Sequence, residues 1–481
     1  MKRKFNFDFN RKTQPFPHQV EAIDYISDNT NVALFDEQGV GKTKIVIDAL
    51  CRNMAEGKID GSLIICKKSL IANWEEEIET HSYLKSIVLR GSDNEKGTRF
   101  MGFSHFYIIN YESLMSEVNR LSMFLKIRKM AIVLDESHRI KGPESKSTQA
   151  IFSLRDKAQK RIIITGTPIA NRPVDLWAQY YFLDGGSLLG NDFDAFKDKY
   201  AVDLKTTKFD STGRFDELKD IIKNNSMRRL KNDVLQLPEK FYHTKRVSLT
   251  EKQASMYEQL KNELYIEIEN SDGQKIIDES NAMLKKLLRL AQLASNPFLI
   301  DKSYKEEPAK FNALDKLVQQ IISKKEKAIV WSSFVENIRI LAKRYGEYGA
   351  LQLYGDIPIE KRTFIVKKFK TDESSKILIA NPAAAKEGLT LTSANHAIYL
   401  DRNFNLTDYL QSQDRIHRIS QKKECHITKI IADNTIDEYI DEILYKKHSL
   451  AKYIQGDASE IKIAQHLTKE EILRVLGGPT S

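Results

Sequence analysis

The segment DEQGVGKT, which begins at Asp36, follows the apolar run NVALF and precedes the helical stretch IVIDALCRNM. In this context the backbone N–H groups of a loop containing Gly39 and Gly41, together with a helix N-terminus, can cradle phosphate. Lys42 would reach the β and γ phosphates of a nucleotide, and Thr43 would coordinate Mg²⁺. Asp36 stands where the general phosphate-loop pattern has its first glycine, so the alternative is a glycine-containing strand-to-helix turn that binds nothing.

A second candidate site lies downstream, where the apolar run AIVL leads directly into Asp135 and Glu136. Ligand sites in open α/β sheets lie at the carboxyl ends of the strands, so Asp135 could hold Mg²⁺ while Glu136 positions and deprotonates an attacking water. A lone Asp-Glu pair after a strand is usually a polar loop. The phosphate loop that precedes it favours the catalytic interpretation.

Two further segments could complete such a site. Thr165–Pro168 (TGTP) ends the run RIII, and its hydroxyls could report the state of the γ-phosphate, although by itself TGTP is only a turn. In QSQDRIHRISQ a helix would place Arg415 and Arg418 at positions i and i+3 on one face, where both could stabilise transition-state charge as arginine fingers. For an isolated DRIHR the alternative is a salt-bridged surface helix.

The elements that must position these residues form two similar sets. Short apolar runs bounded by turn residues suit strands buried on both faces of a parallel sheet, with helical crossovers between them. The first set of runs covers 31–35, 62–66, 107–109, 131–134 and 161–164, and the second set begins at 328, 351, 376, 396 and 426. The sequence therefore predicts an α/β fold with two parallel-sheet lobes.

Between the two sets the chain is charged and helical in pattern, as in LTEKQASMYEQLKNELYIEIEN. One hydrophobic core does not serve a chain of 481 residues, so several domains are expected. The predicted organisation is a first lobe over 1–175, a helical insertion and linker over 176–310, a second lobe over 311–445 and a C-terminal helical extension over 446–481.

Composition adds weaker constraints. Lys and Arg number 75 against 66 acidic residues, for a net charge of +9, which favours contact with a polyanion if the excess lies on one face; a mildly basic solvated surface is the alternative. The three cysteines are far apart and show no metal-ligand spacing, which fits a reducing cytoplasm. Neither a signal peptide nor an apolar run of the ~20 residues that span a bilayer is predicted.

Taken in order, these segments resemble the motifs of the SNF2 family within helicase superfamily 2, from Pro17 to about Tyr439. The family's motif I is usually DExGxGKT, which accounts for the aspartate at position 36. Other segments resemble the Q motif, motifs Ia, Ib, II and III, the linker segments, and motifs IV, IVa and VI; they are PHQ, CKKSLIANW, INYESL, LDESHRIKGPESK, TGTPIANRPVDLW, MRRLKNDVLQLPEK with RLAQLASNPFL, VWSSF, LYGDIPIEKRTFIVKKF and QSQDRIHRISQ.

The resemblance implies two RecA-like lobes that bind ATP and Mg²⁺ between them, with Gln19 reading the adenine. In motif V the family commonly has a Gly-Gly pair where this chain has Ala385-Lys386, and the following GLTLT resembles the annealing-helicase branch. Gly388 is a candidate for the nucleotide-binding set and, with Thr390, for the DNA track. A nucleosome-remodelling role is therefore not expected.

The function predicted is that of an SNF2-type ATP-dependent DNA translocase that remodels DNA or protein–DNA complexes. Its partner would be duplex or junction DNA bound without sequence preference, with a possible unknown protein partner and no membrane. The chain resembles the nearly bare motors of bacteria and phages, acting as a monomer in the cytoplasm at the nucleoid. One alternative is a strand-separating DNA or RNA helicase of the same superfamily, and another is a motor that strips a protein partner along DNA.

Overall fold

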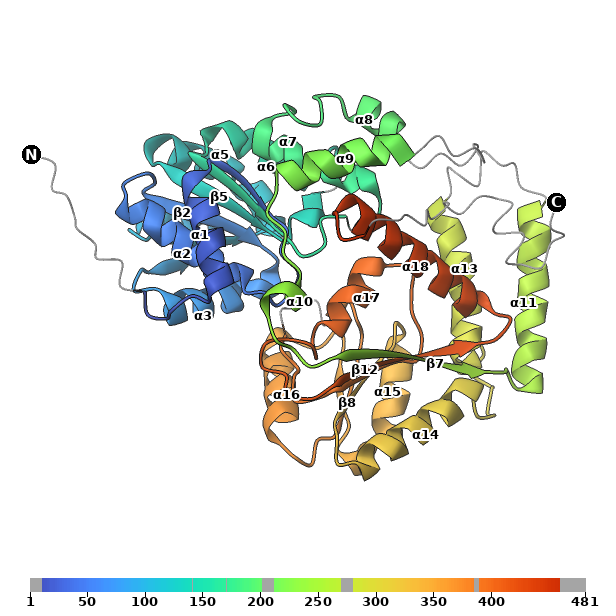
Figure 1. The fold of residues 1–481 in the computed structure, drawn as a ribbon. Coiled ribbons are helices and arrows are strands. Elements are labelled where there is room, and N and C mark those ends of the chain that lie inside the picture. The colour runs from blue at the N-terminus through green and yellow to red at the C-terminus, as the bar shows by residue number, and fades with distance from the viewer. Residues whose placement is uncertain are drawn as a thin grey trace, which may run out of the picture. The chain divides into compact units, whose positions relative to one another are not determined.

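The computed structural model describes residues 11–140, 142–169, 171–200, 212–269, 280–384 and 389–458. The chain divides into two compact units, here named lobe 1 and lobe 2 (Figure 1). Of the described residues, lobe 1 comprises those within 11–200, 212–236 and 451–458, and lobe 2 comprises those within 237–450. Among the described residues, no helix is long and apolar enough to cross a membrane.

Lobe 1 is built on a six-stranded, all-parallel sheet with the strand order β1-β6-β5-β2-β4-β3. Its strands are β1 (Asn31–Leu34), β2 (Gly61–Cys66), β3 (Ser86–Val88), β4 (Phe106–Asn110), β5 (Met130–Asp135) and β6 (Lys160–Ile164). The five predicted runs are confirmed as strands. The sequence did not predict β3, because this edge strand is only three residues long and only half-buried for most of its length.

Helices cover both faces of this sheet, as expected for right-handed parallel crossovers. The isoleucine and leucine side chains of α1 and α2 pack with Trp74 of α3 onto the strands and form one continuous core. The α-helices of lobe 1 are α1 (Pro17–Asp28), α2 (Lys42–Ala55), α3 (Ile71–His81), α4 (Asp93–Met101), α5 (Tyr111–Ile127), α6 (Lys146–Leu154), α7 (Trp177–Asp184), α8 (Phe193–Tyr200), α9 (Thr212–Asn224) and α10 (Lys231–Val234). Short 3₁₀ turns cover 68–70, 137–140, 155–157 and 173–176.

Lobe 2 contains a second six-stranded parallel sheet with the order β7-β12-β11-β8-β10-β9. Its strands are β7 (Lys240–Val247), β8 (Ala328–Trp331), β9 (Leu351–Leu353), β10 (Ile377–Ala380), β11 (His396–Tyr399) and β12 (Cys425–Ala432). Successive residues face opposite sides, so Val330 packs into one core and Ile329 into another. The prediction of a two-lobed α/β fold is confirmed.

The predicted helical insertion and linker over 176–310 did not include the strand β7. This strand pairs with β12 over eight residues, and the two lie side by side in Figure 1. Most of its side chains are exposed, because β7 is an edge strand that is paired on one side only. Edge strands carry polar and charged side chains, so FYHTKRV contains no apolar run that would mark it as a strand.

The other segments predicted as an insertion are divided between the lobes. The described residues of this stretch up to Gln236 belong to lobe 1, whereas α11 (Glu251–Glu269) and α13 (Ser280–Ser295) pack their leucines against α18 (Ile436–Ile454) in lobe 2. The predicted C-terminal extension begins inside α18, and its residues beyond 458 lie outside the described part of the chain. The other α-helices of lobe 2 are α14 (Ala309–Ser323), α15 (Val335–Arg344), α16 (Ile359–Thr371) and α17 (Leu406–Gln413), and short 3₁₀ turns cover 297–299 and 346–348.

Candidate functional site

The phosphate-loop segment connects β1 to the N-terminus of α2, as predicted. Gly41 is the N-cap residue of α2 and has φ +96°, and Gly39 has φ +91°. A Cβ atom added at Gly41 would lie 2.4 Å from Nε2 of Gln19. Both the backbone conformation and the close approach therefore require glycine at position 41, and the loop can fold tightly over the helix N-terminus.

Gln19, the residue predicted to read adenine, is buried against this loop. Its Oε1 accepts a hydrogen bond from the backbone N–H of Phe16 at 2.9 Å, and its Nε2 donates to the carbonyl of Val40 at 3.5 Å. The ring Nε2 of His18 lies 3.1 Å from the same carbonyl. The segment that resembles the Q motif and the phosphate loop are therefore one local structure, and adenine recognition by Gln19 stays a prediction.

Lys42 is the first residue of α2, and its amine lies inside the loop. Its Nζ donates to the carbonyl of Asp36 at 2.8 Å and to that of Glu37 at 3.2 Å. Burial lowers the pKa of Lys42, while the carboxylates of Glu136 and Asp36 oppose this effect. Thr43 follows it in the first turn of α2 and is half-buried. An anion in the loop would meet both the amine and the free N–H groups of the helix.

Asp135 is the last residue of β5, and two aromatic side chains orient it. Its Oδ2 accepts a hydrogen bond from Nε1 of Trp74 at 2.8 Å, and its carbonyl accepts one from the Tyr111 hydroxyl at 2.8 Å. Burial raises the pKa of Asp135 to about 6, repulsion from Glu136 adds to the rise, and Trp74 and Lys42 oppose it. Such a carboxylate gains from a nearby cation.

The sequence interpretation did not predict Trp74 or Tyr111. They belong to the segments that resemble motifs Ia and Ib, and each follows a strand of the same sheet. The carboxyl ends of parallel strands meet at one edge, so an aromatic residue with a polar tip just after such a strand is the signal that could have indicated Tyr111. Trp74 lies within α3, well beyond the end of β2, and carries no such local signal.

Glu136 has φ +52°, in the left-handed region that non-glycine residues rarely adopt. Its Oε2 accepts a hydrogen bond from the Thr165 hydroxyl at 3.2 Å and lies 3.3 Å from Nδ1 of His138, and its Oε1 accepts one from Nε2 of Gln38 at 3.5 Å. Strained backbone of this kind costs about 1–3 kcal/mol and persists where the surroundings over-determine it. In this backbone conformation the carboxylate of Glu136 contacts the phosphate loop and TGTP.

The TGTP segment follows β6 and joins these groups. The Thr165 hydroxyl lies 3.0 Å from Nδ1 of His138 and accepts a hydrogen bond from the backbone N–H of Thr167 at 3.1 Å. A Cβ atom added at Gly166 would lie 2.6 Å from Cγ of Gln38 and 3.4 Å from Nζ of Lys42. Glycine at this position lets TGTP approach the phosphate loop closely.

Gln179 of α7 forms hydrogen bonds with both motif II and motif III. Its Oε1 accepts a hydrogen bond from the Ser137 hydroxyl at 2.7 Å, and its Nε2 donates to the carbonyl of Pro168 at 2.8 Å. Gln179 is fully buried and was not predicted, because its role depends only on contacts between segments distant in the sequence. Lobe 1 thus brings together the loop lysine, the two acidic residues and TGTP in one connected set of contacts.

In lobe 2 the prediction of Arg415 and Arg418 on one helical face is wrong. The helix α17 ends at Gln413, and both arginines lie in the turns that follow. The carbonyl of Arg415 accepts a hydrogen bond from the backbone N–H of Leu391 at 2.8 Å, which takes the place of a helical partner. Arg415 is buried, and Nη1 of Arg418 donates to the Thr390 hydroxyl at 2.9 Å.

Motif VI therefore packs on the segment predicted as motif V. Thr390 is placed by its contact with Arg418, whereas Gly388 and the Ala385-Lys386 pair lie outside the described residues. Whether Gly388 binds nucleotide or DNA stays a prediction.

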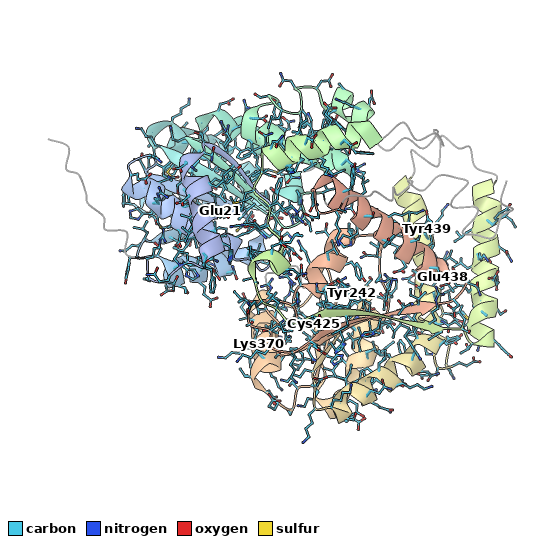
Figure 2. All side chains as sticks on the ribbon, viewed as in Figure 1. Glu21, Tyr242, Lys370, Cys425, Glu438 and Tyr439 are labelled. Carbon is cyan, nitrogen blue, oxygen red and sulfur yellow. The ribbon has the colours of Figure 1, made fainter. Side chains whose placement is uncertain are left out.

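Strand β7 and Pro238, which precedes it, contact the motif VI segment. The ring Nε2 of His417 lies 2.9 Å from the carbonyl of Pro238, and Nζ of Lys240 lies 3.4 Å from Oδ1 of Asp414. The Tyr242 hydroxyl donates to Oε1 of Gln413 at 3.3 Å. Figure 2 shows Tyr242 in the sheet of lobe 2, where β7 runs beside the strand of Cys425. The strand missing from the prediction thus supports the arginine segment.

The donor set fits the predicted metal. Mg²⁺ prefers oxygen ligands and is usually held by one or two carboxylates together with substrate phosphates rather than by a complete protein cage. The Thr43 hydroxyl and the Asp135 carboxylate are donors of this kind. In the described part of the chain, no group of three or more His, Cys, Asp or Glu side chains is arranged for a metal ion.

Comparisons with known proteins give matches along most of the chain. Residues 10–299 match the family described as SNF2-related domain, and residues 309–420 match the helicase conserved C-terminal domain. The chain is 29% identical over 434 residues to a putative ATP-dependent helicase/translocase of Bacillus subtilis, covering 87% of this chain and 46% of that protein. It is 30% identical over 449 residues to an uncharacterized ATP-dependent helicase of Mycoplasma pneumoniae, covering 92% and 42%.

The chain thus spans less than half the length of these curated relatives. Among solved structures, the SWI2/SNF2 ATPase core of Sulfolobus solfataricus in complex with double-stranded DNA is 28% identical, with coverage of 93% of this chain and 95% of that chain and a TM-score of 0.44.

Proposed function

The chain belongs to the SNF2-related family, and on this basis we propose that it is a DNA-stimulated ATPase that couples ATP hydrolysis to movement along DNA. The observation that carries the proposal is the connected set of contacts in lobe 1. There Glu136 accepts hydrogen bonds from Gln38 of the phosphate loop and from Thr165 of TGTP. A loop that merely turned between strand and helix would need no such carboxylate.

The proposed mechanism assigns a role to each predicted residue. The N–H groups around Gly39 and Gly41 bind the phosphates, and Lys42 exchanges its carbonyl partners for the β and γ phosphates. Glu136 positions the attacking water and accepts its proton.

Thr43 and Asp135 would hold Mg²⁺, which supplies positive charge that neutralises the phosphate oxygens. Gln19 contacts the adenine. Arg415 and Arg418 contribute positive charge that stabilises the negative charge developing on the phosphate in the transition state.

The proposed partner is duplex or junction DNA, bound through phosphates and without sequence preference. The supporting observations are the net charge of +9 and the family membership. We further propose that the protein acts as a monomer in the cytoplasm, at the nucleoid. A strand-separating helicase is the second candidate function, favoured by the helicase names of the bacterial relatives.

One experiment separates the two functions. ATPase rates are measured with duplex, single-stranded, forked and RNA ligands, and a triplex-displacement assay is run beside an unwinding assay on the same DNA. Stimulation by duplex or junction DNA, with ATP-dependent triplex displacement and little unwinding, is expected. Robust unwinding, or stronger stimulation by RNA than by DNA, would assign the helicase function instead.

A further inference from the structure

Asp36, the residue that departs from the general phosphate-loop pattern, has a dedicated partner in lobe 1. It is fully buried, and its Oδ1 accepts a hydrogen bond from Nε of Arg229 at 3.0 Å while its Oδ2 accepts one from Nη2. The remaining nitrogen, Nη1, donates to the carbonyl of His18. One guanidinium therefore hydrogen-bonds both to the first residue of the phosphate loop and to the residue that precedes Gln19.

The backbone around Arg229 is held to the same strand. The N–H of Met227 donates to the carbonyl of Ala33 at 2.9 Å, and the carbonyl of Met227 accepts from Phe35 at 2.8 Å. The N–H of Glu37 donates to the carbonyl of Arg229 at 2.9 Å. Because β1 is an edge strand, this segment extends the sheet along its open side and fixes Arg229 beside the loop.

The ion pair also controls charge at the phosphate site. The Asp36 carboxylate attracts the Lys42 amine and would repel phosphate, and a buried charge that loses its partner is costly. A planar guanidinium that donates two parallel hydrogen bonds neutralises that carboxylate and also fixes its direction. Lys42 is then not drawn to the Asp36 carboxylate, and its amine stays among the loop carbonyls, where a phosphate can replace them.

We propose that Arg229 and Asp36 are a positioning pair for the phosphate loop, which sets nucleotide affinity without touching the nucleotide. The proposal rests on the proposed ATPase function. Arg229 acts indirectly, because it hydrogen-bonds to the loop that holds Lys42 and to the residue that precedes Gln19. Asp36 stands in place of a loop glycine because its side chain is the group that Arg229 binds.

The test is a double-mutant cycle in the full-length chain: Arg229→Gln, Asp36→Asn and the two together. The dissociation constant of a fluorescent Mg-ADP analogue is measured directly, with KM and kcat for ATP beside it. Arg229→Gln should weaken nucleotide binding and raise KM by about tenfold to a hundredfold, because the Asp36 carboxylate, no longer neutralised, would repel the phosphates and attract the Lys42 amine. The change in kcat at saturating ATP should be smaller.

The double variant should bind nucleotide better than Arg229→Gln alone, since it leaves no uncompensated buried charge. Arg229→Lys, which keeps the charge but loses the parallel pair of hydrogen bonds, should lie between wild type and Arg229→Gln. The matched control is the Arg52–Asp24 pair of the same lobe, with a nitrogen–oxygen distance of 2.5 Å and exposed fractions of 34% and 54%. Arg52→Gln, Asp24→Asn and their double variant should leave nucleotide affinity within about twofold of wild type.

A wild-type nucleotide affinity and KM in Arg229→Gln, or effects of the two substitutions that simply add, would overturn the positioning role. Thermal unfolding of each variant is recorded, and a variant that does not fold is replaced in the comparison by the double variant and Arg229→Lys. If the wild-type chain itself bound no nucleotide and showed no DNA-stimulated turnover, the proposed function would fail instead, which the wild-type measurement shows separately.

Discussion

Replacing Gly41 with alanine tests whether the phosphate loop and the segment of Gln19 form one structure. At φ +96° an L-residue pays about 1–2 kcal/mol for the left-handed backbone. The added Cβ would also lie 2.4 Å from Nε2 of Gln19, and the atoms found within 4 Å of it all belong to that side chain.

To relieve this clash, the amide group of Gln19 must move away from the added Cβ atom. Such a move would break the hydrogen bond from the backbone N–H of Phe16, and a lost hydrogen bond costs about 0.5–1.5 kcal/mol. The total expected loss in lobe 1 is therefore about 1.5–3.5 kcal/mol. Because Gln19 is the predicted adenine contact, the KM for ATP should rise as well.

Two further variants separate the contributions to this loss. Gly57→Ala is the matched control, since Gly57 has φ +69° and no heavy atom within 4 Å of the added Cβ; it should cost only the backbone contribution of about 1–2 kcal/mol. In the double variant Gly41→Ala with Gln19→Ala the clash is absent. Its loss of stability should therefore be smaller than the sum of the losses in the two single variants.

The assay must resolve one lobe, because a two-lobed chain need not unfold in a single step. Hydrogen exchange at the amides of α1 and α2, measured by mass spectrometry, reports the local opening free energy there. The reasoning is refuted if Gly41→Ala and Gly57→Ala cost the same, or if the Gln19→Ala substitution shows no coupling to Gly41→Ala.

Three other predictions follow from the site. Lys42→Ala should lose nucleotide binding, whereas Glu136→Gln should bind nucleotide and lose turnover by about 10²- to 10⁴-fold; equilibrium binding and steady-state rates distinguish them, and near-normal turnover in either variant contradicts its role. Arg415→Ala and Arg418→Ala should each lower kcat far more than ATP affinity, because arginine fingers are worth about 10³- to 10⁵-fold in rate; a change confined to affinity would exclude that role. In lobe 2, burial lowers the pKa of both His396 and His426, whose stacked rings lie on adjacent strands with centroids 4.9 Å apart. The unfolded chain therefore takes up these protons first, so the stability of lobe 2 should be complete above about pH 6.5 and should fall as the pH drops below it. Glu326 pairs with His396 and opposes this effect, while His243 and Lys324 reinforce it. His426→Gln should flatten the pH dependence of hydrogen exchange in β11 and β12, and an unchanged slope would contradict the assignment.

The strands that carry the site were predictable because burial on both faces leaves an uninterrupted apolar run. β5 is buried along its length up to Asp135, and the run AIVL shows this in the sequence. β7 is paired on one side only and exposes most of its side chains, so its sequence FYHTKRV is indistinguishable from a charged loop or helix. The local hydrophobic pattern therefore identifies strands that are buried on both faces. It fails for an edge strand whose side chains are exposed.

The arginine segment shows a second limit. The i, i+3 spacing of Arg415 and Arg418 is compatible with a helix, and α17 does lead toward it. Beyond the helix end other groups take the backbone hydrogen bonds: the N–H of Leu391, distant in the sequence, donates to the carbonyl of Arg415, and the side-chain Nε2 of the nearby Gln421 donates to that of Ile416. Spacing alone cannot predict competition of this kind for backbone groups.

Asp36 shows how such long-range contacts explain a departure from a local motif. Within the segment DEQGVGKT the aspartate only replaces an expected glycine, and nothing nearby in the sequence suggests a reason. Its partner is 193 residues away, on a segment that has no strand-like pattern yet hydrogen-bonds along the edge of β1. A glycine in that position would give the loop freedom but no attachment, whereas the aspartate gives it an attachment that depends on Arg229. The phosphate loop of this chain is therefore completed by residues outside the loop, and its affinity for nucleotide should depend on them.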